Sequence, residues 1–187
     1  VFSRETTNSM IRIGIICPSE IAFRRFLPAL IKSTDLFEYA GVAIADISEW
    51  EGADVDVINS ERLKARSFID PYGGVIYNSY SSMIQSTDID AIYLPLPPAL
   101  HYHWAKLALL SGKHIFVEKP ATTSSILTNE LLKIASKNNL AVHENYMFVF
   151  HDQIQAINKI INSGEIGAVR LYKISFGFPR RKSNDFR

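Results

Sequence analysis

Short runs of β-branched and aromatic residues alternate along the chain with longer segments whose apolar residues recur every three or four positions. The runs are typical of buried strands and the periodic segments of amphipathic helices. The runs predict strands over residues 11–16, 39–45, 73–77, 90–94, 115–117 and 141–144. The periodic segments predict helices from Ile21 onward, over 59–68 and 80–85, through His101 to Gly112, and between Leu127 and Asn138. This alternation predicts an α/β fold with a right-handed, doubly wound parallel sheet.

The pattern changes after residue 145. An aromatic-rich stretch leads into a predicted helix over 153–163, and residues 168–178 alternate like a strand of an antiparallel sheet. We therefore expect one domain over 10–145, with 146–187 as a linker and the truncated start of a second, α+β domain. Residues 1–9 are polar, and we expect them to be a disordered extension.

Composition narrows the function classes. Of the 187 residues, 47% are hydrophobic and 21% charged, which is ordinary for a soluble globular protein. The net charge of +1 gives no electrostatic reason to expect nucleic acid or a membrane as partner, and no apolar run is long enough to span a bilayer. The one cysteine, Cys17, excludes an intrachain disulfide, and the histidines lack the spacing of a metal site. We expect a cytoplasmic protein without a bound metal.

The segment 112–120 brings a charged pair to the end of an apolar strand. Residues 115–117 have strand character, and Pro120 cannot continue a sheet, so Glu118 and Lys119 lie where the strand stops. In a parallel α/β sheet, ligands lie just beyond the carboxyl ends of the strands. A lysine in this place is more often a solvated surface residue. The preceding predicted strand, which also ends in a proline-rich loop, favours a functional role.

This passage resembles the Gfo/Idh/MocA family of NAD(P)-dependent oxidoreductases. The matching motifs follow the family's order and spacing, and they are Leu94-Pro95-Leu96-Pro97, His101, Ala108-Leu109, Gly112-Lys113-His114 and Glu118-Lys119-Pro120. The similarity extends over residues 10–179 and implies a Rossmann domain followed by the start of a substrate and oligomerisation domain. It also implies a homo-oligomer and a catalytic role for Lys119, which would assist proton transfer while the cofactor takes the hydride. The implied cofactor-binding residues are Cys17, Pro18, Ser19, Glu20, Ile21, Asp46, Leu94, Pro95, Leu96, Pro97, His101, Glu118 and Lys119.

The turn after the first predicted strand departs from the glycine-rich pattern of dinucleotide sites. Cys17 and Ser19 stand where the first two glycines belong, and only Ala22 satisfies its position. Side chains there must alter the loop path or hold the ligand further away. Ser19 can donate a hydrogen bond, and Arg24 follows within the helix.

Asp46 ends the second predicted strand, at the position that bonds the adenosine ribose in Rossmann folds. A carboxylate disfavours a 2′-phosphate, so we expect NAD or NADP as cofactor with a modest preference for NAD. Asp is also a common turn residue, which is the alternative explanation.

Three functional hypotheses follow. The first is an oxidoreductase acting on a CH–OH group of a sugar, nucleotide-sugar or cyclic polyol. The second is a non-catalytic protein of the same fold that senses a dinucleotide or a sugar, which the residues Cys17 and Ser19 favour. The third is an inactive fragment.

Overall fold

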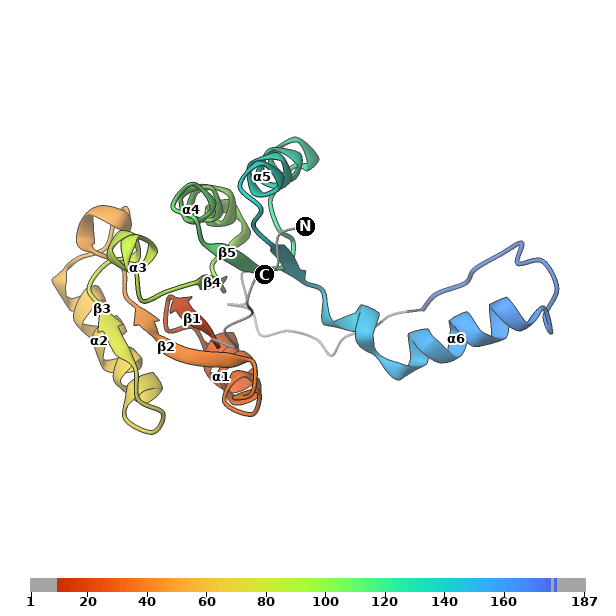
Figure 1. Ribbon diagram of the computed structural model, residues 1–187, viewed down its shortest axis with the longest axis horizontal. Coiled ribbons are helices and arrows are strands. Elements are labelled where there is room, and N and C mark those ends of the chain that lie inside the picture. The colour runs from red at the N-terminus through yellow and green to blue at the C-terminus, as the bar shows by residue number, and fades with distance from the viewer. Residues whose placement is uncertain (1–9, 176, 178–187) are drawn as a thin grey trace, which may run out of the picture. The chain divides into compact units, whose positions relative to one another are not determined.

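The computed structural model describes residues 10–175 and 177, which fall into two units that divide between Tyr146 and Met147. In the first unit, the described strands form one parallel sheet in the order β3-β2-β1-β4-β5-β6 (Figure 1). The strands are β1 (Ile11–Ile16), β2 (Phe37–Ala43), β3 (Val75–Tyr77), β4 (Ala91–Leu94), β5 (His114–Glu118) and β6 (Val142–Asn145). The predicted doubly wound α/β sheet is confirmed.

Helices cover both faces of this sheet (Figure 1). The helices are α1 (Leu27–Leu30), α2 (Val55–Ile69), α3 (Tyr80–Gln85), α4 (Pro98–Leu110) and α5 (Ser125–Lys137), with a short 3-10 turn η2 (Ile47–Glu49). One buried cluster joins α3, α4 and α5 to the sheet through residues such as Met83, Trp104 and Leu131. The other joins α1 and α2 to the opposite face through residues such as Leu27 and Phe68. The central strands β1 and β4 are therefore covered on both sides, which explains their nearly continuous apolar sequences.

The helix after β1 begins differently from the prediction. Its first turn, η1 (Ala22–Phe26), is a π-helix in which the N–H of Leu27 donates to the carbonyl of Ala22. Pro28, which follows, has no N–H to donate to a regular α-helical bond. The predicted helix is therefore present, but a wide π-helical turn precedes its α-helical segment α1.

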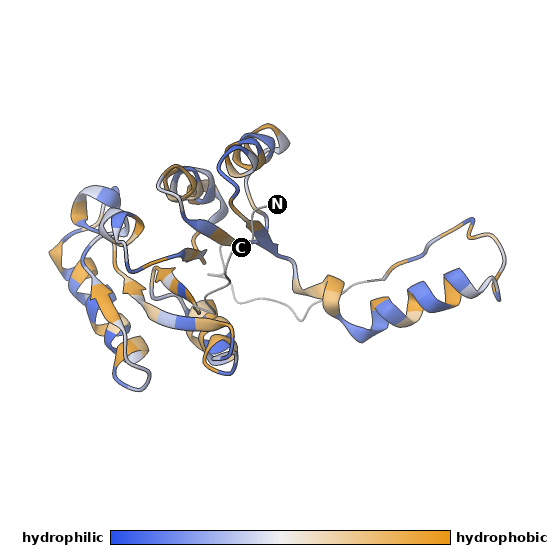
Figure 2. Cartoon of the chain, viewed as in Figure 1, coloured by the Kyte–Doolittle hydropathy of each residue, from blue (hydrophilic) through white to orange (hydrophobic). Residues whose placement is uncertain are grey.

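The second unit contains the 3-10 turn η3 (Met147–Phe150) and the helix α6 (Asp152–Ser163). In Figure 2, α6 carries alternating bands of apolar and polar residues. The strand predicted over 168–178 is not formed in its described part, residues 168–175, because no other described strand pairs with it there. The predicted extension, residues 1–9, lies outside the described residues. No helix within the described part of the chain is both long and apolar enough to cross a membrane.

Candidate functional site

A cavity of about 720 Å³ opens beside the carboxyl ends of β1 and β4. These two strands are neighbours at the centre of the sheet, where the strand order changes direction, and the loops that follow them separate to opposite faces. The walls also include part of α2 and Trp50, which follows η2. The predicted cofactor residues that line this cavity are Cys17, Pro18, Ser19, Glu20, Pro95, Leu96 and Pro97.

Cys17 adopts the left-handed backbone conformation, with a φ of 75°. Its N–H donates to the carbonyl of Ala43 at 2.9 Å, which holds the turn against the end of β2. The cysteine therefore keeps the backbone turn that a glycine normally supplies at this position. Burial, helped by the negative charge of Glu61, raises the pKa of the thiol to about 11, so the thiol is neutral at pH 7.

Two side chains of the same loop form polar contacts at the start of the helix that follows β1. The hydroxyl of Ser19 accepts a hydrogen bond from the N–H of Ala22 at 3.2 Å. Glu20 forms an exposed ion pair with Arg24, with 2.7 Å between the oxygen and the nitrogen. Arg24 thus offsets the negative charge of Glu20 at the wall of the large cavity. Ile21, also among the predicted cofactor residues, is not part of the cavity wall.

Asp46 lies past the end of β2, beside a second and more open cavity of about 580 Å³. Its Oδ1 atom accepts hydrogen bonds from the hydroxyl and the N–H of Ser48, which lower the pKa of the carboxyl group. The N–H of Asp46 donates to Glu49, whose carboxylate also accepts from the N–H groups of Tyr80 and Ser81 at 2.8 and 2.9 Å. These bonds fix the loop after β2 to the start of α3 and leave an ionised carboxylate at the strand end.

Lys119 is exposed directly after β5, and its peptide bond to Pro120 is cis. The preceding Glu118 is held from both neighbouring strands, because it accepts hydrogen bonds from the hydroxyl of Tyr93 at 2.7 Å and from the amide of Asn145. Within residues 10–175 and 177, the ammonium group of Lys119 has no assigned hydrogen-bond or ion-pair partner. A rigid strand end therefore presents a cation that is available to a ligand, although Lys119 is not itself a wall residue of the large cavity.

The peptide group that follows Lys119 and Pro120 is held on both sides. The carbonyl of Pro120 lies 2.9 Å from Nδ1 of His101, and the N–H of Ala121 donates to Glu144 at 2.8 Å. The other ring nitrogen of His101, Nε2, lies 2.6 Å from the carbonyl of Leu96. The side chain of His101 has 0% exposed surface, so its ring does not reach a ligand in this arrangement. The structure gives His101 two loop carbonyls as partners, in place of the predicted contact with a cofactor.

Sequence reasoning missed three residues that support this strand end. Tyr93, Glu144 and Asn145 hold Glu118 and Ala121 in place. The only signal was their position near the ends of predicted strands beside the one that carries the lysine. Leu94, predicted to contact the cofactor, is fully buried in the core instead. Among the described residues, no group of three or more His, Cys, Asp or Glu side chains is arranged to hold a metal ion.

Comparison with known proteins places this geometry in a family. Residues 11–146 match the Gfo/Idh/MocA family model, described as an oxidoreductase family with an NAD-binding Rossmann fold. A dTDP-3,4-didehydro-2,6-dideoxy-alpha-D-glucose 3-reductase from Streptomyces violaceoruber is 36% identical over 183 residues, which is 98% of this chain and 48% of that protein. The protein of the same name from Actinomadura kijaniata is 33% identical over 95% of this chain and 48% of its own length.

Solved structures agree with this assignment. A 3-ketoreductase variant from Actinomadura kijaniata, in complex with TDP-benzene and NADP, is 33% identical with a TM-score of 0.73 over 87% of this chain and 45% of that one. An oxidoreductase from Thermotoga maritima is 25% identical with a TM-score of 0.72, over 85% of this chain and 45% of that one. The chain spans about half the length of the curated relatives it matches. It belongs to the Gfo/Idh/MocA oxidoreductase family, with an NAD-binding Rossmann fold.

Proposed function

We propose that the protein is an NAD(P)-dependent oxidoreductase that interconverts a carbonyl and a secondary alcohol on a nucleotide-linked sugar. The observation that carries the proposal is the exposed Lys119 at the rigid end of β5, on the same sheet edge as the large cavity. An ammonium group there can donate a proton to a carbonyl oxygen as it is reduced, or an amine can take one from the alcohol. The dTDP-sugar reductases among the relatives favour a nucleotide-linked sugar over a free sugar or a cyclic polyol.

The residues around the large cavity suit a dinucleotide. The turn at Cys17 has the backbone conformation of such sites, and Trp50, Phe68 and Leu96 provide apolar walls for a flat ring. When bound, the nicotinamide supplies or accepts the hydride. An ionised Asp46 would bond ribose hydroxyls and repel a 2′-phosphate, which supports NAD as the preferred cofactor. The related 3-ketoreductase was solved with NADP, so NADH and NADPH need to be compared directly.

The domain arrangement and assembly belong to the same proposal. Residues 146–187 would begin the second domain, which supplies the other wall of the active site and the contacts of a homo-oligomer.

A second candidate function is a dinucleotide or sugar sensor without turnover. It is favoured by the side chains of Cys17 and Ser19, which occupy the cavity wall where two glycines are usual.

The test is Lys119→Met in the whole protein, assayed with dTDP-linked keto-sugars and with NADH or NADPH. Turnover should fall on the order of 10²-fold or more, because proton transfer loses its donor. Dinucleotide affinity, followed by tryptophan fluorescence, should change little, with NADH bound more tightly than NADPH.

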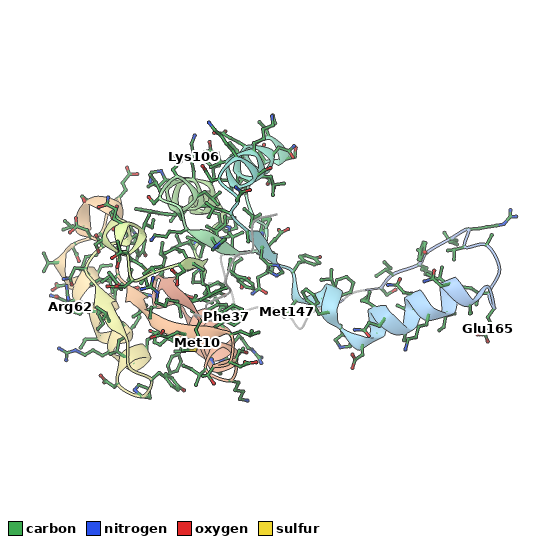
Figure 3. The ribbon with its side chains drawn as sticks, viewed as in Figure 1. Met10, Phe37, Arg62, Lys106, Met147 and Glu165 are labelled. Carbon is green, nitrogen blue, oxygen red and sulfur yellow. The ribbon has the colours of Figure 1, made fainter. Side chains whose placement is uncertain are left out.

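Lys106→Met is the matched control. Lys106, labelled on α4 in Figure 3, pairs with Glu130 on α5 at 2.7 Å, so its loss removes the same charge outside the candidate site. Equal turnover in the wild type and Lys119→Met would remove Lys119 from the mechanism. Dinucleotide binding by the wild type without turnover on any sugar would support the sensor.

A further inference from the structure

His101 connects the two loops that the proposed reaction requires. It lies at the end of the first turn of α4, and its buried ring fills the space between the loop after β4 and the loop after β5. The Nε2 atom lies 2.6 Å from the carbonyl of Leu96, and the Nδ1 atom 2.9 Å from the carbonyl of Pro120. Both partners are backbone oxygens from segments that are far apart in the sequence.

The two carbonyls have different neighbours. Leu96 is a wall residue of the large cavity, between Pro95 and Pro97. Pro120 directly follows Lys119, and the N–H on the far side of the same peptide group is held by Glu144. Because the imidazole ring is rigid and its two nitrogens face different loops, it sets the separation between the cavity wall and the strand end that carries the lysine.

We propose that His101 is a positioning residue that holds the cofactor wall at Leu96 and the Lys119 loop at a fixed separation. Its importance for turnover rests on the proposed function. The contact with Leu96 shapes the dinucleotide cavity, whereas the contact with Pro120 fixes the backbone from which the ammonium group of Lys119 extends. The two contacts therefore have separable effects, the first on cofactor affinity and the second on turnover.

Two substitutions keep one of the two contacts each. In His101→Asn the side-chain amide nitrogen takes the place of Nδ1, so a donor faces Pro120 and nothing replaces the ring nitrogen that faces Leu96. In His101→Gln the amide nitrogen takes the place of Nε2, so a donor faces Leu96 and nothing replaces the ring nitrogen that faces Pro120. Each variant of the whole protein serves as the control for the other, since both lose the ring and both gain an amide.

Two measurements are made on both variants. Amide hydrogen exchange should rise mainly in residues 94–100 for His101→Asn and mainly in residues 118–123 for His101→Gln. Dinucleotide affinity, from the concentration dependence of tryptophan fluorescence, should fall several-fold in His101→Asn. In His101→Gln, kcat should fall on the order of tenfold while affinity is nearly unchanged, because the lysine is misplaced and the cavity wall is not.

The outcomes separate this proposal from the proposed function. Exchange that rises equally in both segments, or in neither, overturns the positioning role. The role is also overturned if exchange follows the expected pattern but kcat is equal in the two variants. If the wild type neither binds a dinucleotide nor turns over, the proposed function fails. The exchange pattern then still decides whether His101 holds the two loops at their separation.

Discussion

Residues other than glycine rarely adopt the left-handed backbone conformation. Their Cβ atom crowds the following carbonyl oxygen, which costs roughly 1–2 kcal/mol. Cys17 occupies such a position at the wall of the large cavity. Burial and the bond to the carbonyl of Ala43 hold it there. The loop thus has the path of a dinucleotide turn together with a thiol that a glycine would not present to the ligand.

Replacing Cys17 with glycine should raise the affinity for NADH by several-fold. Glycine removes the backbone strain and lets the backbone approach the pyrophosphate. Fluorescence titration measures the dissociation constant. Cys17→Ala is the control, since it removes the sulfur and keeps the strained Cβ. An equal gain in both variants would mean that the thiol, and not the backbone, limits binding.

The role of Cys17 shows where residue-level prediction ends. The sequence indicates that two glycines are missing, and it predicts either an altered loop or a more distant ligand. It does not indicate which, because the path of the loop depends on the hydrogen bond to the carbonyl of Ala43, which comes from elsewhere in the chain. His101 is a similar case, since its two carbonyl partners lie on loops whose approach the sequence does not specify.

Among the elements, β2 requires a glycine at its centre, at Gly41. The β1–β2 register shifts at this point, so that Ile13 pairs with Tyr39 and the next residue, Gly14, with Gly41. Gly41 has a φ of 152°, and a Cβ there would lie 2.1 Å from the carbonyl oxygen of Val75 on β3. A methyl group at this position cannot coexist with the β2–β3 pairing.

Gly41→Ala should therefore lower the free energy of unfolding by about 3 kcal/mol or more, because the backbone of an adjacent strand must move. Gly52→Ala is the control, with a φ of 80° and no atom within 4 Å of the added Cβ. It should cost about 1 kcal/mol from backbone strain alone. Urea unfolding of both variants measures the difference. Equal losses would show that β3 accommodates the methyl group.

Most elements could be predicted because their signals are local. The apolar runs that form β1, β4 and β5 are short and end at polar or proline residues. Helix α2 begins at Val55, earlier than the predicted residue 59, because the side chain of Asp54 accepts a hydrogen bond from the N–H of Val57 and caps the helix. The sequence before residue 59 is acidic and therefore predicts a loop. The strand predicted over 168–178 fails in its described part for a different reason. A strand depends on pairing, which alternation in one segment does not supply.

At the scale of the whole molecule, β1 and β4 join the two halves of the sheet. Arg12 on β1 forms a bidentate pair with Asp90, with both side-chain contacts at 2.9 Å, and the N–H of Arg12 donates to the same carboxylate. The hydrogen bond from the Arg12 side chain lowers the pKa of Asp90. This pair joins the amino ends of β1 and β4, at the sheet edge opposite the large cavity.

Asp90→Asn should lower the free energy of unfolding at pH 7 by about 1 kcal/mol, discounted for partial solvent exposure. Because the pKa of Asp90 is lowered in the folded state, its stabilisation is complete above the ordinary aspartate pKa of about 4. It is lost as the pH falls through the lower folded-state pKa. Thermal melts from pH 7 to pH 2 should therefore show the gap between wild type and variant narrowing below pH 4. A constant gap would assign the effect to shape and not to charge.

The sequence predicts which side of the sheet carries the site residues, but not the hydrogen bonds that hold them in place. Parallel strands end at one edge, so Cys17, Leu96 and Lys119 were expected at the same side of the sheet. The hydrogen bonds that fix Glu118 between Tyr93 and Asn145 depend on the register of three strands. Register is set by packing over the whole sheet, and no single segment specifies it.

The central place of the β1–β4 pair also has a consequence for how the chain acquires its structure. Arg12 and Asp90 are separated by 78 positions, and β2 and β3 are synthesised in between. One side of β1 must stay open until β4 arrives, which leaves an apolar strand able to associate with other nascent chains. The large cavity can therefore form only after β4 has been synthesised, through a long-range pairing of the kind that slows folding.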